Sequence, residues 1–175
     1  MIITGGNYKG RKIQAPDEKI TRPTLSKVRQ GLFNTLFSLI GNFEDKSFLD
    51  LFGGSGIMGL EALSRGFASV LVFEKNPKIA QILKKNYSTL GLKPNLKIGD
   101  TLKLIPNLDK SFDVIYIDPP YYSGVYEEVF AKLHEFPLKE TLVVAEHTEP
   151  LNIIGFTLVK EKSYGGKKVS FYKKN

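Results

Sequence analysis

The four residues Asp118-Pro119-Pro120-Tyr121 follow a short apolar run, Val114–Ile117, and combine the groups needed to hold a planar amine. Two consecutive prolines fix the backbone and leave the Pro119 carbonyl without a strand partner, so this carbonyl and the Asp118 carboxylate can both accept hydrogen bonds. The amino group of a nucleobase offers two such N–H donors, and Tyr121 is placed to stack on the base. Holding both N–H bonds frees the nitrogen lone pair to attack a methyl group. The residues indicate Asp118 as a hydrogen-bond acceptor and leave open whether it also takes a proton.

A glycine-rich turn between the apolar run Phe48–Phe52 and the helical pattern Ile57–Ser64 is suited to a cofactor. Glycines allow a tight turn and close approach of a ligand, while free amides at the helix start can meet a polar group. Asp50 lies inside the first strand, where an acid is costly, and Glu74 ends the next strand, where it can accept hydrogen bonds from ribose hydroxyls. The loop is G-G-S-G-I-M-G rather than G-x-G-x-x-G, and Asp50 suits a cationic amino-acid moiety better than a pyrophosphate. The pattern therefore favours S-adenosylmethionine over NAD.

The candidate cofactor-binding residues comprise this loop, the two acids and their neighbours. They are Asp50, Phe52, Gly53, Gly54, Ser55, Gly56, Glu74, Lys75, Asp100 and Thr101. Asp100 either contacts the adenine amino group or only caps the helix that begins at Thr101. The plain structural alternatives are a tight turn that binds nothing and a proline turn that only caps a strand, and both leave the acids unexplained.

The elements that must position these residues alternate regularly from residue 47 onward, as in repeated strand–helix–strand units. Strands are predicted over 48–52, 70–73, 96–98, 114–117 and 142–145, and helices over 57–64, 77–90, 101–105 and 126–134. Strands 156–162 and 168–172 flank Gly165-Gly166 with no helix between them, which predicts a hairpin and an antiparallel strand at the sheet edge. A hairpin over 2–14 and a helix of about four turns ending at Gly41 are expected before the alternating region. The predicted fold is α/β: a seven-stranded, mainly parallel, doubly wound sheet.

The net charge of +7 is confined to the two ends of the chain. Residues 1–30 carry seven basic residues against two acidic ones, residues 160–175 carry six lysines against Glu161, and the middle is slightly acidic. Aromatic residues such as Tyr8 and Tyr164 lie among these charges. If the fold brings the ends together, they would form a phosphate-binding surface; the alternative is a pair of solvated tails.

The composition excludes several classes of protein. There are no cysteines and only two histidines, which leaves no disulfide framework, thiolate nucleophile or cysteine-based zinc site. His134 and His147 are expected to be structural. No apolar run approaches the roughly 18 residues of a membrane span, and the N-terminus lacks the apolar stretch of a secretory leader. We therefore expect one cytoplasmic domain over 1–175, with 1–20 as a basic hairpin and 21–175 as a helix plus core.

Four segments together resemble the RsmD family, bacterial enzymes that methylate guanine N2 in 16S ribosomal RNA. They are RPTLSKVRQGLFN at 22–34, DLFGGSGIMGLEALSRG at 50–66, FEKN at 73–76 and DPPY at 118–121. The resemblance runs from Gly5-Gly6 to the hairpin at Tyr164-Gly165. DPPY also occurs in DNA adenine-N6 and cytosine-N4 methyltransferases, so it specifies an exocyclic amine without choosing the base, whereas 22–34 is specific to the family. The chain departs from the family at Gly54, where Ala is common, and it is on the short side.

The resemblance implies a Rossmann-like class I S-adenosylmethionine-dependent methyltransferase. We expect it to use no metal and to act as a monomer. Its partner would be 16S rRNA within the small subunit or an assembly intermediate. The implied RNA-binding residues are those of the N-terminal hairpin and the following helix: Tyr8, Lys9, Arg11, Lys12, Arg22 and Arg29. Arg29 could instead reach the cofactor carboxylate or only solvent.

Two other functions stay open. A DNA amino-methyltransferase would share DPPY, but such enzymes commonly need an additional target-recognition region, for which no stretch here is long enough. A non-catalytic RNA-binding module would need only the basic ends, and would not need residues 118–121.

Overall fold

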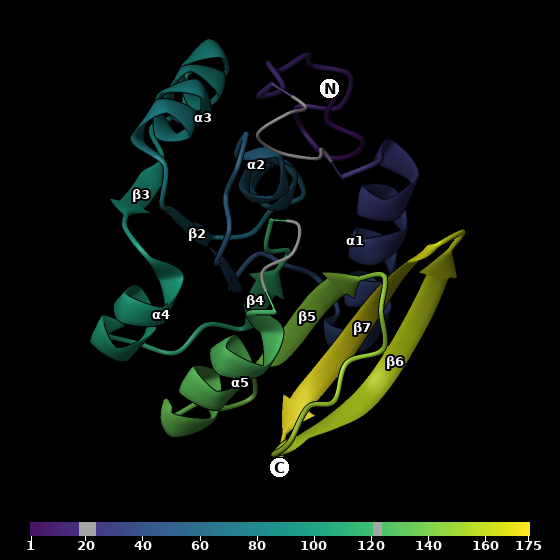
Figure 1. The fold of residues 1–175 in the computed structure, drawn as a ribbon. Helices are drawn as coiled ribbons and strands as arrows, with labels where there is room; N and C mark the ends of the chain where they lie inside the picture. The colour runs from purple at the N-terminus through teal and green to yellow at the C-terminus, as the bar shows by residue number, and fades with distance from the viewer. Residues whose placement is uncertain (18–23, 121–123) are drawn as a thin grey trace.

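The computed structural model describes residues 1–17, 24–120 and 124–175. Figure 1 shows a central twisted sheet with helices on both of its faces. The strands are β1 (Ser47–Asp50), β2 (Ser69–Glu74), β3 (Asn95–Ile98), β4 (Val114–Ile117), β5 (Leu142–His147), β6 (Phe156–Tyr164) and β7 (Lys167–Lys174). The helices are α1 (Ser26–Ile40), α2 (Ile57–Ser64), α3 (Pro77–Thr89), α4 (Thr101–Leu104), the 3-10 turn η1 (Ile105–Asn107) and α5 (Tyr126–Glu135).

The seven strands form one sheet in the order β3-β2-β1-β4-β5-β7-β6. Strands β1 to β5 pair in parallel, whereas β7 is antiparallel to both β5 and β6. The predicted mainly parallel sheet with one antiparallel strand is therefore confirmed. Because β1 pairs with β2 on one side and β4 on the other, the strand order reverses at β1 and β4, and open α/β sheets bind ligands beside such a reversal.

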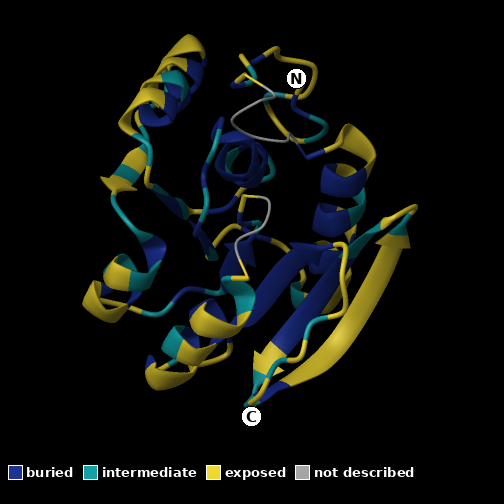
Figure 2. Cartoon of the chain, in the orientation of Figure 1, coloured by how far each residue is buried: buried dark blue, intermediate teal, exposed yellow. Residues whose placement is uncertain are grey.

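Each face of the sheet carries its own apolar cluster, because successive strand residues point to opposite faces. On β1, Phe48 belongs to the cluster that also contains residues of α1, α2 and α3, and Leu49 belongs to the cluster that contains residues of α5 and η1. Figure 2 shows the central strands buried, with the outer strand β6 exposed along most of its length.

The N-terminal segment folds back on itself as predicted, but it pairs through one isolated bridge, Ile2 with Lys12, rather than through a strand ladder. The Ile3 amide donates to the Arg11 carbonyl at 3.0 Å, and Ile3 and Ile13 are buried in the same cluster as α1 and α2. The segment is thus attached by its apolar side, and its basic side chains lie on the outside.

A buried carboxylate, Glu61 on α2, ties this segment to two helices. Its Oε1 accepts hydrogen bonds from the Thr4 amide at 2.7 Å and from Arg29 Nε at 3.2 Å, and its Oε2 accepts from Arg65 Nε at 3.1 Å. Glu61 is 0% exposed and Arg29 is 1% exposed. Glu61, Arg29 and Arg65 form an ion-pair cluster between the N-terminal segment, α1 and α2.

The expectation that Arg29 contacts RNA is corrected by this cluster. Besides Glu61, the Arg29 guanidinium donates to the carbonyls of Thr24 and Ile2 and to the Ser26 hydroxyl, so each of its nitrogens is bonded inside the protein. Arg29 lies on the apolar side of α1 because Glu61 compensates its charge there. Its role is to fix the backbone at Thr24.

Candidate functional site

Three acidic residues gather where β1, β2 and β4 end. Asp50 is the last residue of β1, Glu74 is the last residue of β2, and Asp118 immediately follows β4. Burial raises the pKa of Asp50 to about 7, opposed by the Phe52 amide and increased by the charge of Glu74. Burial and the charge of Glu146 raise the pKa of Asp118, and the charge of Asp50 adds a smaller increase. This edge of the sheet is therefore an electronegative site suited to a cationic ligand.

The glycine loop lies across the ends of β1 and β2 and is held by Glu74. The Gly54 amide donates to Glu74 Oε2 and the Asn76 amide to Glu74 Oε1, both at 2.8 Å. Gly54 has φ +55°, a backbone conformation that residues with a side chain rarely adopt. A Cβ on Gly53 would lie 2.3 Å from a Val72 methyl. The tight path of the loop thus requires glycine at Gly53, whereas Gly54 has room for the Ala that is common in the family.

Asp50 has the property expected of a residue that meets a cation. Its Oδ1 accepts a hydrogen bond from the Phe52 amide at 3.1 Å, whereas its Oδ2 is buried without any hydrogen-bond partner. A buried, unpartnered carboxylate oxygen is costly, and a ligand ammonium or sulfonium would relieve that cost. The residues present therefore fit the cationic amino-acid part of S-adenosylmethionine.

Asp100 performs the capping role that its position allowed. Its Oδ1 accepts from the Leu102 amide at 2.9 Å at the start of α4, and its Oδ2 pairs with the exposed Lys75 at 3.3 Å. Burial raises the pKa of Asp100, but these two donors lower it more, so the net pKa lies below its ordinary value. Contact between Asp100 and adenine stays a prediction.

The other predicted cofactor residues differ in what they can offer. Phe52 is half-buried beside the loop. The Ser55 hydroxyl accepts from the Ile57 amide at 3.3 Å, and the Thr101 hydroxyl donates to the Leu51 carbonyl, so both hydroxyls act in holding the loop and the strand end. Gly56, at φ +84°, is the N-cap residue of α2.

The second part of the site is the corner after β4. Asp118 Oδ2 accepts from the Thr24 hydroxyl at 3.2 Å and lies 3.4 Å from the Tyr116 hydroxyl oxygen. Burial, followed by the charge of Glu146, raises the pKa of Asp118 to about 8. Pro119 is buried and Pro120 is exposed. Tyr121, predicted to stack on the base, lies outside the described residues.

Sequence reasoning missed the residues that surround Asp118. Glu146, on β5, is 0% exposed and accepts from the Tyr116 hydroxyl at 2.6 Å, and Lys167 of β7 pairs with its other oxygen. An acid within the apolar strand Leu142–His147 is the same pattern that identified Asp50, and it could have identified Glu146.

The predicted RNA-binding residues lie on or near the N-terminal segment. Lys9, Arg11 and Lys12 are exposed, and Tyr8 is half-buried against the core. Arg11 also donates to the Thr89 carbonyl at 3.3 Å, which places this segment beside the end of α3. Arg22 lies outside the described residues. Figure 1 places the two chain termini at opposite ends of the molecule, so the joint basic surface considered for both ends does not form around the termini themselves.

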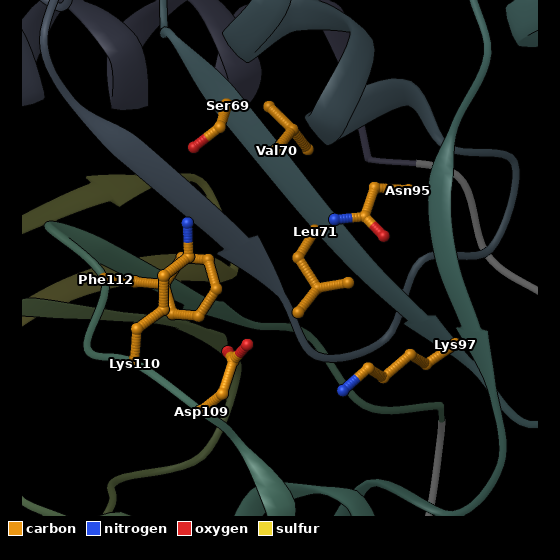
Figure 3. Close-up of a pocket in the computed structure, with 8 residues that line it drawn as sticks. All are labelled: Ser69, Val70, Leu71, Asn95, Lys97, Asp109, Lys110 and Phe112. Atoms are coloured by element: carbon orange, nitrogen blue, oxygen red, sulfur yellow. The ribbon is translucent and has the colours of Figure 1, made fainter.

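A cavity of about 260 Å³ lies at the opposite edge of the sheet, where β2 and β3 begin. Figure 3 shows Leu71 and Phe112 along it, with the polar ends of Lys97, Lys110 and Asp109 around it. It is therefore separate from the acids at the carboxyl ends of the strands.

Within residues 1–17, 24–120 and 124–175, no group of three or more histidine or acidic side chains is arranged to hold a metal ion. In the same ranges, no helix has both the length and the apolar character required to cross a membrane.

Comparison with known proteins assigns the chain to a family. The model of the family described as conserved hypothetical protein 95 matches residues 1–173. The chain belongs to this family. The "Ribosomal RNA small subunit methyltransferase D" of Buchnera aphidicola is 34% identical, with 93% of this chain and 87% of the relative covered. The "Putative rRNA methyltransferase YlbH" of Bacillus subtilis is 32% identical, with 99% of both chains covered.

A solved structure gives the same assignment. The "Putative methyltransferase yhhF" of Escherichia coli superposes with a TM-score of 0.84 at 29% identity, over 100% of this chain and 98% of the other. The family membership and these likenesses confirm the resemblance to the RsmD family and the predicted class I methyltransferase fold.

Proposed function

We propose that this protein transfers a methyl group from S-adenosylmethionine to the exocyclic N2 amine of a guanine in small-subunit (16S) ribosomal RNA. The observation that carries the proposal is the juxtaposition of two acids: Asp50, with an unpartnered buried oxygen, and Asp118, followed by two prolines. The names of the relatives support ribosomal RNA as the substrate class, and the family resemblance supports guanine N2. We place the enzyme in the cytoplasm, acting as a monomer on the small subunit or an assembly intermediate.

The residues divide the work between donor and acceptor. S-adenosylmethionine, when bound, supplies an electrophilic methyl group on a sulfonium. Asp50 would bind the cationic amino-acid part, Glu74 would accept from the ribose hydroxyls, and the loop 53–56 would lie against the donor. Asp118 and the Pro119 carbonyl would each accept a hydrogen bond from one N–H group of the amine. These two hydrogen bonds would orient the nitrogen lone pair towards the methyl group. The ammonium formed by transfer is acidic enough to lose its proton to water.

Donor affinity is expected to rise with pH in a way that depends on Asp50. Below a pKa of about 7 the Asp50 carboxyl carries a proton and loses its attraction for a cation, so affinity should increase about tenfold between pH 6 and pH 8. Asp50→Asn should weaken binding and flatten this dependence. Calorimetry with the donor or its demethylated product measures it, with the exposed Asp109→Asn as the control. An equally steep slope in Asp50→Asn would refute the role of Asp50.

RNA binding is expected to depend on the exposed basic side chains of the N-terminal segment. Replacing Lys9, Arg11 and Lys12 with Ala should lower RNA affinity and reduce its salt dependence by roughly one unit of slope per lost contact, with donor binding unchanged. The matched control replaces three exposed lysines outside this segment: Lys97 on β3, Lys110 before β4 and Lys139 before β5. Filter binding over a range of salt gives both quantities. Equal slopes for the two triple variants would mean that the segment is a solvated tail.

The reaction itself is tested by incubating the protein with labelled donor and three acceptors: duplex DNA, free ribosomal RNA and assembled small subunits. Label in either RNA sample at guanine N2 supports the proposal and identifies the form of the substrate. Label in DNA would favour the DNA amino-methyltransferase, and RNA binding without label would favour the non-catalytic module.

A further inference from the structure

At the corner after β4, the carboxylates of Asp118 and Glu146 are bridged by the hydroxyl groups of Thr24 and Tyr116. Tyr116 Oη lies 2.6 Å from Glu146 Oε2 and 3.4 Å from Asp118 Oδ2, and Thr24 Oγ1 lies 3.2 Å from Asp118 Oδ2 and 3.4 Å from Glu146 Oε2. Each hydroxyl has one proton and faces two acceptors. With Tyr116 donating to Glu146 over the shorter distance, the Thr24 hydroxyl is left to donate to Asp118. The hydrogen bonding of Asp118 therefore depends on the charge of Glu146.

The C-terminal hairpin supplies a cation to this group. Lys167, the first residue of β7, forms an ion pair with Glu146 Oε1, at 16% exposure for the lysine and 0% for the glutamate. The preceding Tyr164 packs on α1, since a Cβ on Gly31 would lie 2.0 Å from the Tyr164 hydroxyl oxygen. This close fit holds the turn of the hairpin in place and positions the Lys167 side chain beside Glu146.

The ionisable groups around Asp118 act in opposite directions. Glu146 on β5 and, more weakly, Asp50 on β1 disfavour its negative charge, and Lys167 on β7 favours it, as does the Thr24 hydroxyl. Tyr116 on β4 and Tyr126 on α5 also face it as neutral phenols, because burial and the nearby carboxylates raise the pKa of both. Without the lysine, the charge of Glu146 would raise the pKa of Asp118 further above about 8, and the carboxylate would be available as an acceptor only at higher pH.

We propose that Lys167 and Glu146 are positioning residues that act on the ionisation of Asp118 in opposite directions and together set the pH range in which its carboxylate accepts hydrogen bonds from the reacting amine. The lysine offsets the charge of Glu146, and the ionised Glu146 holds the Tyr116 hydroxyl, which leaves Asp118 free to face the substrate. The inference rests on the proposed function for its catalytic meaning, but the ionisation of Asp118 can be measured without it.

The two members of this ion pair should shift the pH dependence in opposite directions. Lys167→Met removes the favourable charge, so the rising limb of the rate of transfer should move to higher pH by about one unit or more. Glu146→Gln removes the unfavourable charge and should move the limb to lower pH. Lys167→Arg should restore the wild-type profile. A merely structural ion pair would give no opposite shifts, so shifts in the same direction would overturn the inference.

A direct titration separates this inference from the proposed function. Carbon-13 NMR of the protein labelled at aspartate carboxyl carbons, with the Asp118 resonance assigned through Asp118→Asn, follows the ionisation of Asp118 in each variant. Lys168→Met is the matched control, because Lys168 pairs with Glu161 at the surface and should leave the Asp118 midpoint unchanged. Opposite midpoint shifts without methyl transfer would leave the inference standing and refute the function. Methyl transfer with unchanged midpoints would support the function and refute the inference.

Discussion

Replacing Asp118 with Ala should slow methyl transfer by on the order of a hundredfold or more while changing donor and RNA affinity little. The carboxylate accepts a hydrogen bond that strengthens as the amine nitrogen changes geometry and gains positive charge. The interaction therefore stabilises the transition state more than the bound substrate. Asp118→Asn keeps an acceptor oxygen without the charge, and its rate should lie between those of wild type and Asp118→Ala.

Single-turnover rates with labelled donor, together with separate binding measurements for donor and RNA, test this expectation. Asp109→Ala is a suitable control, because Asp109 is exposed at the far edge of the sheet. A loss confined to RNA affinity, with an unchanged single-turnover rate, would show that Asp118 contributes to recognition and not to chemistry.

Replacing Glu61 with Ala should lower the free energy of unfolding by about 3–5 kcal/mol, a large part of the stability of a protein of this size. The substitution leaves Arg29, at 1% exposure, without its buried counter-charge, and it also removes the acceptor of the Thr4 amide. Both effects come from charged or polar groups that stay buried after their partner is lost.

Urea unfolding at neutral pH measures the loss. Glu135→Ala provides a matched comparison, because Glu135 also lies on a helix in an ion pair, but with 68% of its side chain exposed; its replacement should change stability by less than about 1 kcal/mol. Similar losses in the two variants would mean that the cluster around Glu61 contributes no more than a surface ion pair.

The central elements could be predicted from the sequence because their apolar pattern is unambiguous. The helix at 57–64 and the strand at 114–117 have the predicted bounds, and both lie in the buried middle of the molecule. The last two strands are longer than predicted, at 156–164 and 167–174. β6 is an exposed edge strand with polar residues along its length, so hydrophobicity does not mark where it ends.

The acidic residues of the site could be predicted because each is recognised from a single apolar strand and its last residues. Asp50, Glu74 and Asp118 each stand at the end of an apolar run, and the structure brings them to one edge. Thr24 and Lys167 could not be found in this way, because their importance comes from contacts with residues that are remote in sequence. Arg29 was misinterpreted for the same reason, since its partner Glu61 lies 32 residues further along the chain.

The contact between Thr24 and Glu146 spans 122 residues, whereas the bond from Gly54 to Glu74 spans 20. Closing a long loop costs more chain entropy than closing a short one, so the corner around Asp118 is entropically more costly to assemble than the glycine loop. The donor loop is complete once β1 and β2 are paired, but the corner around Asp118 needs both β5 and the segment before α1. Under the proposed function, the residues that would bind the donor are therefore brought together by local contacts, whereas those that would orient the amine depend on contacts across most of the chain.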